Sequence, residues 1–200
     1  MNLEAEIKNE GLNATCLAPG LFKWSDVVTP SEAELYAQMA AAQQHGWINT
    51  SPKDTSQELS VFNLTNDTQL TEKFQGVLTE IKDKVMSVAA NEKRVTVGNP
   101  HTPQLLRMAA GRGFSRDYVY DKPHLPASLV ATLFLTSHPS DGHRIYDYFD
   151  VQIAPQAGTL LVHPAMFVYT SGDLVSCEDR YALRWVFART PDVPKTERGQ

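Results

Sequence analysis

The chain has 200 residues, 42% of them apolar, and a formal net charge of −5 at pH 7. That length suits a single domain with a core large enough to be stable alone, and an acidic chain is not attracted to nucleic acid or to an anionic membrane. Cys16 and Cys177 lie far apart and outside any CxxC pattern, which favours a reduced, cytoplasmic protein. No apolar run has membrane-spanning length, and residues 1–6 do not resemble a signal peptide. We therefore expect a cytoplasmic protein that binds neither nucleic acid nor membranes.

The first half of the chain predicts a short strand from Leu17 and then two helices. Thr29-Pro30-Ser31-Glu32 is typical of a helix start, because Thr29 can cap the helix, Pro30 fits its first turn and Glu32 can complete a capping box. This helix is expected over residues 30–45. A second helix is expected over residues 70–91, with a loop over 50–57 and a strand over 59–64 between the two. The apolar stripe of this second helix consists of Phe74, Val77, Leu78, Ile81, Val85 and Val88.

The second half of the chain predicts strands only, separated by turns rich in Gly, Pro, Asp and Ser. Short strands at regular spacing with little helix between them are typical of a sandwich or barrel. We therefore expect an α+β protein with its helices first, forming one domain over residues 1–189 and a loose tail over 190–200. The expected strands cover residues 94–97, 104–108, 128–136, 146–153, 158–163, 167–170 and 180–188.

The last of these strands, over residues 180–188, carries two arginines on the face opposite its large apolar residues. Its period of two places Tyr181, Leu183, Trp185 and Phe187 on one face, and Arg180, Ala182, Arg184 and Val186 on the other. Arg180 has two interpretations. Because Glu178 and Asp179 precede it, Arg180 could sit at an exposed strand start and pair with a surface carboxylate; alternatively, it points into a polar cavity and meets an acidic ligand. Arg107 and Arg184 are similar candidates.

Four segments of the chain together resemble the non-haem iron, 2-oxoglutarate-dependent dioxygenases of the prolyl-hydroxylase type. They are residues 103–114 (PQLLRMAAGRGF), 128–136 (SLVATLFLT), 155–158 (PQAG) with the strand that follows, and Arg180-Tyr181-Ala182. The resemblance implies a double-stranded β-helix, or jelly roll, with N-terminal helices packed on it. It also implies an active site inside the open end of the jelly roll. Fe(II) and 2-oxoglutarate are implied by this resemblance alone.

The residues that hold iron in that family are replaced in this chain. The family binds Fe(II) through two His and one carboxylate. Residues 117–119 (Asp-Tyr-Val) stand where the His-x-Asp pair belongs, and residues 168–170 (Val-Tyr-Thr) stand where the second His belongs. The position of the oxoglutarate-binding Arg is kept as Arg180, with Ala182 where the family usually has Ser. A replacement metal set would be Asp117, His163 and Tyr169, although a lone inward histidine such as His163 is more often a hydrogen-bonded core residue. His138 and His143 flank a turn and are expected to face solvent.

Three hypotheses about function follow. In the first, the chain is a divergent oxygenase that acts on or binds a small molecule in the jelly-roll pocket with a non-standard or lost metal site. In the second, it is a pseudo-oxygenase without iron that serves as a ligand-binding or partner subunit, with a protein partner or as a homodimer. In the third, the barrel is filled with side chains and the protein is an interaction module. The sequence contains no P-loop, GxGxxG, GxSxG or HExxH motif.

Overall fold

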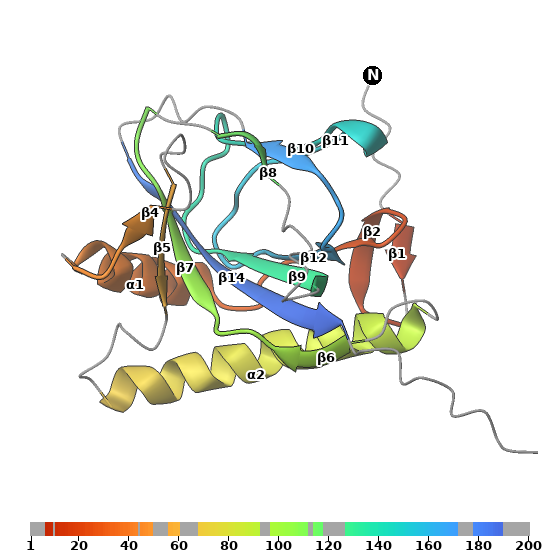
Figure 1. Ribbon diagram of the computed structural model, residues 1–200, viewed down its shortest axis with the longest axis horizontal. Helices are drawn as coiled ribbons and strands as arrows, with labels where there is room; N and C mark the ends of the chain where they lie inside the picture. The colour runs from red at the N-terminus through yellow and green to blue at the C-terminus, as the bar shows by residue number, and fades with distance from the viewer. Residues whose placement is uncertain are drawn as a thin grey trace, which may run out of the picture.

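Two antiparallel sheets and two helices form the architecture of the protein. The computed structural model describes residues 7–9, 11–43, 45–49, 56–60, 68–92, 97–111, 114–117, 127–171 and 178–189. Within these ranges no helix is long and apolar enough to cross a membrane. Figure 1 shows the smaller sheet lying over the central strands of the larger one, with the helices on the far side of the larger sheet.

The larger sheet contains ten strands of the described chain, all paired antiparallel. Its centre is formed by β12 (Leu160–Pro164), β9 (Ala127–Phe134) and β14 (Arg180–Arg189), and β6 (Val97–Pro100) pairs with β14. Apart from β6, the strands of the larger sheet lie side by side in the order β1 (Ile7–Asn9), β2 (Ala14–Ala18), β3 (Leu21–Trp24), β12, β9, β14, β7 (Gln104–Met108), β5 (Ser56–Ser60) and β4 (Ile48–Asn49).

The smaller sheet has four strands, in the order β11 (Val151–Ile153), β10 (Arg144–Tyr146), β13 (Tyr169–Ser171) and β8 (Phe114–Asp117). Residues from both sheets share one buried cluster, so the two inner faces pack against each other. Two facing antiparallel sheets joined by connections that cross between them are the arrangement of a jelly roll. The predicted strand over residues 146–153 is wrong in one respect. A 3₁₀ turn (Asp147–Phe149) and a left-handed residue, Asp150 (φ 53°), divide that segment between β10 and β11.

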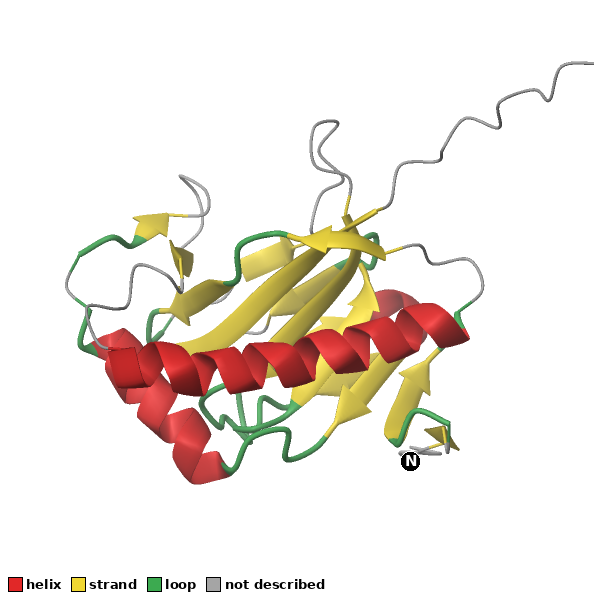
Figure 2. Ribbon diagram, turned by 90° about the horizontal axis from the view of Figure 1, so that it is seen from below, coloured by secondary structure: helices red, strands yellow, loops and turns green. Residues whose placement is uncertain are grey.

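The helices cover the outer face of the larger sheet. Figure 2 shows α2 (Thr68–Asn91) running across the strands, with α1 (Pro30–Ala41) at its end. Thr29 and Glu32 form the predicted capping box, in which the Thr29 backbone N–H donates to the Glu32 carboxylate at 2.9 Å. All six residues of the predicted apolar stripe on α2 are buried, because that stripe faces the sheet. The first helix ends at Ala41, four residues earlier than expected.

Strand β14 separates two hydrophobic clusters, as its alternation predicts. Tyr181, Leu183, Trp185 and Phe187 belong to the larger cluster, which lies between the larger sheet and the helices. Ala182, on the opposite face of the strand, belongs to the smaller cluster between the two sheets. Side chains on the inner face of the larger sheet therefore point at the smaller sheet, and this is where polar residues gather.

Gly158 brings the turn before β12 against the chain near Val28. It has φ +85°, and a Cβ atom at this position would lie 2.3 Å from the carbonyl oxygen of Val28. Its N–H donates to the Phe134 carbonyl, and its own carbonyl accepts from the Val27 N–H, both at 2.9 Å. Only glycine fits this position, because both the backbone conformation and the space exclude a side chain.

Most predicted strand positions hold to within a few residues, with 104–108 reproduced in full. The strand expected over residues 94–97 is found at Val97–Pro100, and the one over 59–64 is found at Ser56–Ser60. Residues 93–96 and 61–67 lie outside the described part of the chain, as does the tail over 190–200.

Candidate functional site

A row of side chains runs across the inner face of the larger sheet, from its β3 side to β7. Directly opposed residues of antiparallel strands project to the same face. Leu161 of β12 is opposed to Lys23 of β3 and to Thr132 of β9. Arg184 of β14 is opposed to Thr132 and to Gln104 of β7, and its Nη2 donates to the Gln104 side-chain oxygen at 3.3 Å. The row therefore presents two cations, an amide and a hydroxyl to the space between the sheets.

Arg144 enters this space from the smaller sheet. It is only 3% exposed, and its Nη1 donates to Thr132 Oγ1 at 3.1 Å. The guanidinium carbon lies 4.2 Å from the centre of the Tyr169 ring and 5.4 Å from the centre of the Phe134 ring. A guanidinium over an aromatic face is attracted by the ring quadrupole, the more so where water is excluded. These contacts place a cation between the sheets beside Tyr169.

Arg180 also points inward, so the interpretation that it sits at an exposed strand start is wrong. Its side chain is buried, and its Nη1 donates to the Gly142 carbonyl. Burial first, and then the charge of Arg144, lower the pKa of Arg180 to about 9, so the two guanidinium groups act on each other within one interior. The surface carboxylate considered as its partner, Asp179, instead accepts from Arg107 Nε at 2.7 Å.

His163 lies at the centre of an aromatic group. Its Nδ1 is 2.8 Å from the Pro164 carbonyl, so Nδ1 carries the proton that it donates. Burial and the nearby Arg144 lower the pKa of His163 to about 3, which keeps the ring neutral. Its ring stacks on Phe167 at 6.0 Å and meets Tyr146 and Tyr169 edge-on, at 5.5 and 5.8 Å between ring centres. Nε2 is buried and has no hydrogen-bond partner among the residues that the structure describes.

The predicted replacement metal set is brought together in part. His163 and Tyr169 are neighbours in the interior. Asp117 is opposed to Tyr169 in the pairing of β8 with β13, but its side chain lies outside the described part of the structure. At the other positions considered for a second histidine ligand, Val168 is exposed and Thr170 is half-buried.

The donors described in this interior do not fit an Fe(II) site. In the described ranges no three His, Cys, Asp or Glu side chains are grouped so as to hold a metal ion. His163 and Tyr169 offer one imidazole and one phenol, and the phenol binds a metal well only after it loses its proton. The Arg144 guanidinium, 4.2 Å from the Tyr169 ring centre, adds a positive charge that opposes a bound cation.

Two other residues differ from expectation. His138 was expected to face solvent, and this is wrong: it is 4% exposed, and its Nδ1 lies 3.5 Å from Asp141 Oδ1. Its backbone N–H donates to the Pro155 carbonyl at 2.8 Å, and the Gly142 carbonyl a few residues later accepts from Arg180. Arg144 was not singled out from the sequence at all. The signal was present, because Arg144 and Tyr146 alternate around Ile145 as inward residues of a short strand do.

No protein-family model and no curated protein matches this sequence, but solved structures match its fold. A prolyl-4-hydroxylase from Pseudomonas putida aligns with a TM-score of 0.65 at 14% identity, over 86% of this chain and 93% of that one. The viral collagen prolyl hydroxylase of Paramecium Bursaria Chlorella virus-1, in a 2OG complex, gives 0.62 at 11% identity over 86% and 97%. A prolyl hydroxylase from Trichoplax adhaerens, in complex with a hypoxia inducible factor peptide fragment, gives 0.68 at 10% over 85% and 84%. The chain thus has the fold of the Fe(II)/2-oxoglutarate oxygenases, and the predicted jelly roll with N-terminal helices is confirmed.

Proposed function

We propose that this protein binds a small dicarboxylic acid of the 2-oxoglutarate class between its two sheets and works as a ligand-binding protein on an oxygenase fold. The observation that carries the proposal is the pair of buried guanidinium groups, Arg144 and Arg180, in one interior. Guanidinium groups bind carboxylates in a bidentate manner, and such charge-assisted bonds are about twice as strong as neutral ones. Burial, and after it the repulsion from Arg144, lowers the pKa of Arg180, and a bound dianion would offset that repulsion.

The surroundings of the two arginines favour an anion and disfavour a metal ion. Arg184 adds a third cation on the inner face, through the row that leads from Thr132 to Gln104. The neutral His163 adds no charge of either sign. Because the Arg144 guanidinium supplies a positive charge beside Tyr169, a carboxylate could be held here without iron. The similar viral hydroxylase was solved as a 2OG complex, which supports a ligand of this class on this fold.

Thermal shift in the presence of EDTA tests this proposal. Succinate, glutarate and 2-oxoglutarate should stabilise the protein, whereas the uncharged diamide of glutaric acid should not. A ligand present at about 100 times its Kd adds about 2.7 kcal/mol, which is a rise of roughly 5–11 °C in Tm for a chain of this size. Equal shifts from the diamide and the diacids, or no shift from any of them, would contradict the proposal.

Variants at the two arginines locate the site. Arg180→Gln and Arg144→Gln should each weaken diacid binding roughly 10- to 100-fold, as expected for the loss of a charged hydrogen bond worth about 1.5–3 kcal/mol. Arg189→Gln is the matched control, because Arg189 lies at the exposed end of the same strand, β14. If the diacid affinity falls equally in all three variants, the effect is one of net charge, and the proposal that the diacid binds at Arg144 and Arg180 is wrong.

The iron-dependent alternative, in which Asp117, His163 and Tyr169 form the metal set, has a direct test, although the donors described in the interior do not fit an Fe(II) site. His163 and Tyr169 lie 5.8 Å apart between ring centres, and the Asp117 backbone is opposed to Tyr169. If these residues hold iron, the protein is an oxygenase with a non-standard metal site. Loading the apo-protein anaerobically with Fe(II) and 2-oxoglutarate, followed by oxygen, would then give a visible absorption band and succinate. Either signal, lost in His163→Gln, would replace the binding proposal with this one.

A further inference from the structure

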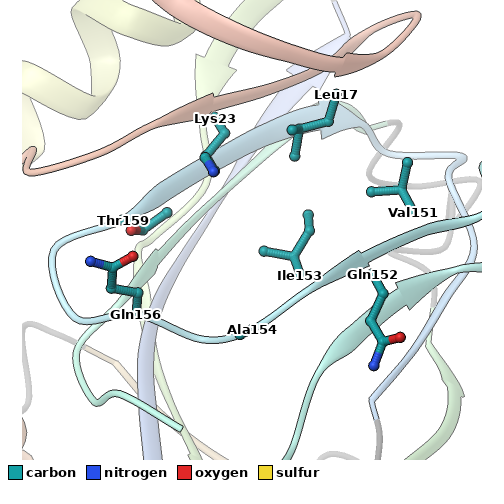
Figure 3. A pocket seen from close by; sticks show the side chains of 8 residues that line it. All are labelled: Leu17, Lys23, Val151, Gln152, Ile153, Ala154, Gln156 and Thr159. Carbon is teal, nitrogen blue, oxygen red and sulfur yellow. The ribbon is translucent and has the colours of Figure 1, made fainter. Parts of the chain in front are cut away.

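A pocket of about 170 Å³ lies at one side of the jelly roll, where the edge strand of the smaller sheet approaches the hairpin formed by β2 and β3. Strand β11 forms one wall, β2 and β3 form another, and the connection between β11 and β12 closes one end (Figure 3). The lining residues are Leu17, Lys23, Val151, Gln152, Ile153, Ala154, Gln156 and Thr159.

The pocket has a polar end and an apolar end. Figure 3 shows Lys23, Thr159 and Gln156 gathered at one end, and the aliphatic side chains of Leu17, Val151 and Ile153 at the other. Thr159 is a polar residue that is only 3% exposed. A cation, a hydroxyl and an amide at one end of a pocket, with three aliphatic side chains at the other, suit a ligand with an anionic head and a short apolar tail.

The polar end is held in place by the backbone around it. The Thr159 N–H donates to the Gln156 carbonyl at 3.0 Å, and its carbonyl accepts from the Phe134 N–H at 2.9 Å. The Ala157 N–H donates to Ser137 Oγ at 2.9 Å. On the other side, Lys23 is fixed in register opposite Leu161. A site whose groups are positioned before the ligand arrives loses less freedom on binding.

The size of the pocket limits the ligand. An apolar cavity of about 150 Å³ holds one benzene molecule, so about 170 Å³ suits a ligand of roughly six to eight non-hydrogen atoms. The site is distinct from the arginine-lined interior. Leu161, which is fully buried, stands between Lys23 and Thr132 in the row across the larger sheet. Two strand spacings of about 4.8 Å each separate the Cα atoms of those two polar residues.

We propose that this pocket is a second binding site, for a short-chain aliphatic monocarboxylate. The carboxylate would lie against Lys23 Nζ and the Thr159 hydroxyl, and the alkyl chain would lie against Leu17, Val151 and Ile153. The proposal does not rest on the diacid site, because it uses a different cation and a different set of walls.

Titration with butyrate, followed by ¹H–¹⁵N NMR, tests the proposal. Butyrate should give saturable shifts at the backbone amides of residues 17, 23, 151–153 and 156–159, and butyramide, which has the same size without the charge, should bind at least roughly tenfold more weakly. Shifts that do not saturate, or that appear instead around residues 144 and 180, would overturn it.

Two variants and two controls complete the test. Lys23→Met keeps the aliphatic stem of the side chain and should weaken butyrate binding roughly tenfold or more. Thr159→Val, which keeps the shape, should also weaken it. Lys82→Met removes a charge from the exposed face of α2 and should leave binding unchanged. Arg180→Gln should retain butyrate binding, which separates this site from the diacid site. Equal binding in Lys23→Met, Thr159→Val and the unaltered protein would overturn the proposal.

Discussion

Replacing Gly158 by alanine should destabilise the protein severely, because two separate costs coincide at that residue. A left-handed backbone costs a non-glycine residue about 1–2 kcal/mol, and φ at Gly158 is +85°. The new Cβ would lie 2.3 Å from the Val28 carbonyl oxygen, so the backbone must move. That movement disturbs the hydrogen bonds to Phe134 and Val27, each worth about 1 kcal/mol. The expected loss is about 3–4 kcal/mol in total, and at roughly 2–4 °C per kcal/mol Tm should fall by roughly 6–16 °C.

Two other glycines serve as matched controls. Gly20 has φ +84°, but its Cβ would lie 3.4 Å from the Pro164 side chain, which is an ordinary contact. Gly20→Ala should therefore cost only the conformational part, about 1–2 kcal/mol. Gly76, on the exposed face of α2, has open space around it, and Gly76→Ala should stabilise the helix by about 1 kcal/mol. Urea unfolding of the three variants gives the free energies. If Gly158→Ala is no less stable than Gly20→Ala, the inference that a Cβ atom at Gly158 clashes with the Val28 carbonyl is wrong.

Thr29→Ala should lower the free energy of unfolding by about 1 kcal/mol, because it removes the side-chain cap of α1. Urea unfolding measures this loss, and an unchanged free energy would show that the capping box does not stabilise the helix. The second prediction concerns pH. Because the pKa of His163 is lowered to about 3 in the folded protein, the unfolded chain binds the proton more readily below about pH 6.5 and stability falls with acidification. Between pH 7 and 5 the protein should lose about 2 kcal/mol more than His163→Gln does. Parallel pH profiles would mean that His163 is not buried and neutral.

The features that the sequence predicts well depend on local periodicity. The stripe on α2 and the two faces of β14 follow from which residues recur at helical or alternating spacing. The capping box at Thr29 and Glu32 is predicted equally well, because both partners lie within one turn of helix. Each of these features depends only on residues that are close together in the sequence, so it can be predicted without knowing the tertiary structure.

The features that the sequence missed depend on which strands face each other. Arg144 gains its place beside Thr132 and Tyr169 only when the smaller sheet closes over the larger one. Lys23 joins the same inner face through its register with Leu161, which is 138 positions away in sequence. His138 is buried because its turn is bonded to Pro155, and local turn chemistry does not reveal that contact. For Arg180, the alternation of β14 left open whether the side chain faces solvent or the interior, because the period of two does not say which face of a strand is covered.

The division of the buried residues between the two faces of the larger sheet has a practical consequence. Of the buried hydrophobic residues described, the cluster under the helices holds 28, whereas the cluster between the sheets holds eight. Most of the apolar burial that keeps the chain folded thus lies away from the inner face of the larger sheet. The inner face around Thr132 and Arg184, together with Arg144 opposite it on the smaller sheet, could therefore be redesigned to accept a chosen ligand, while the helical side preserves the scaffold.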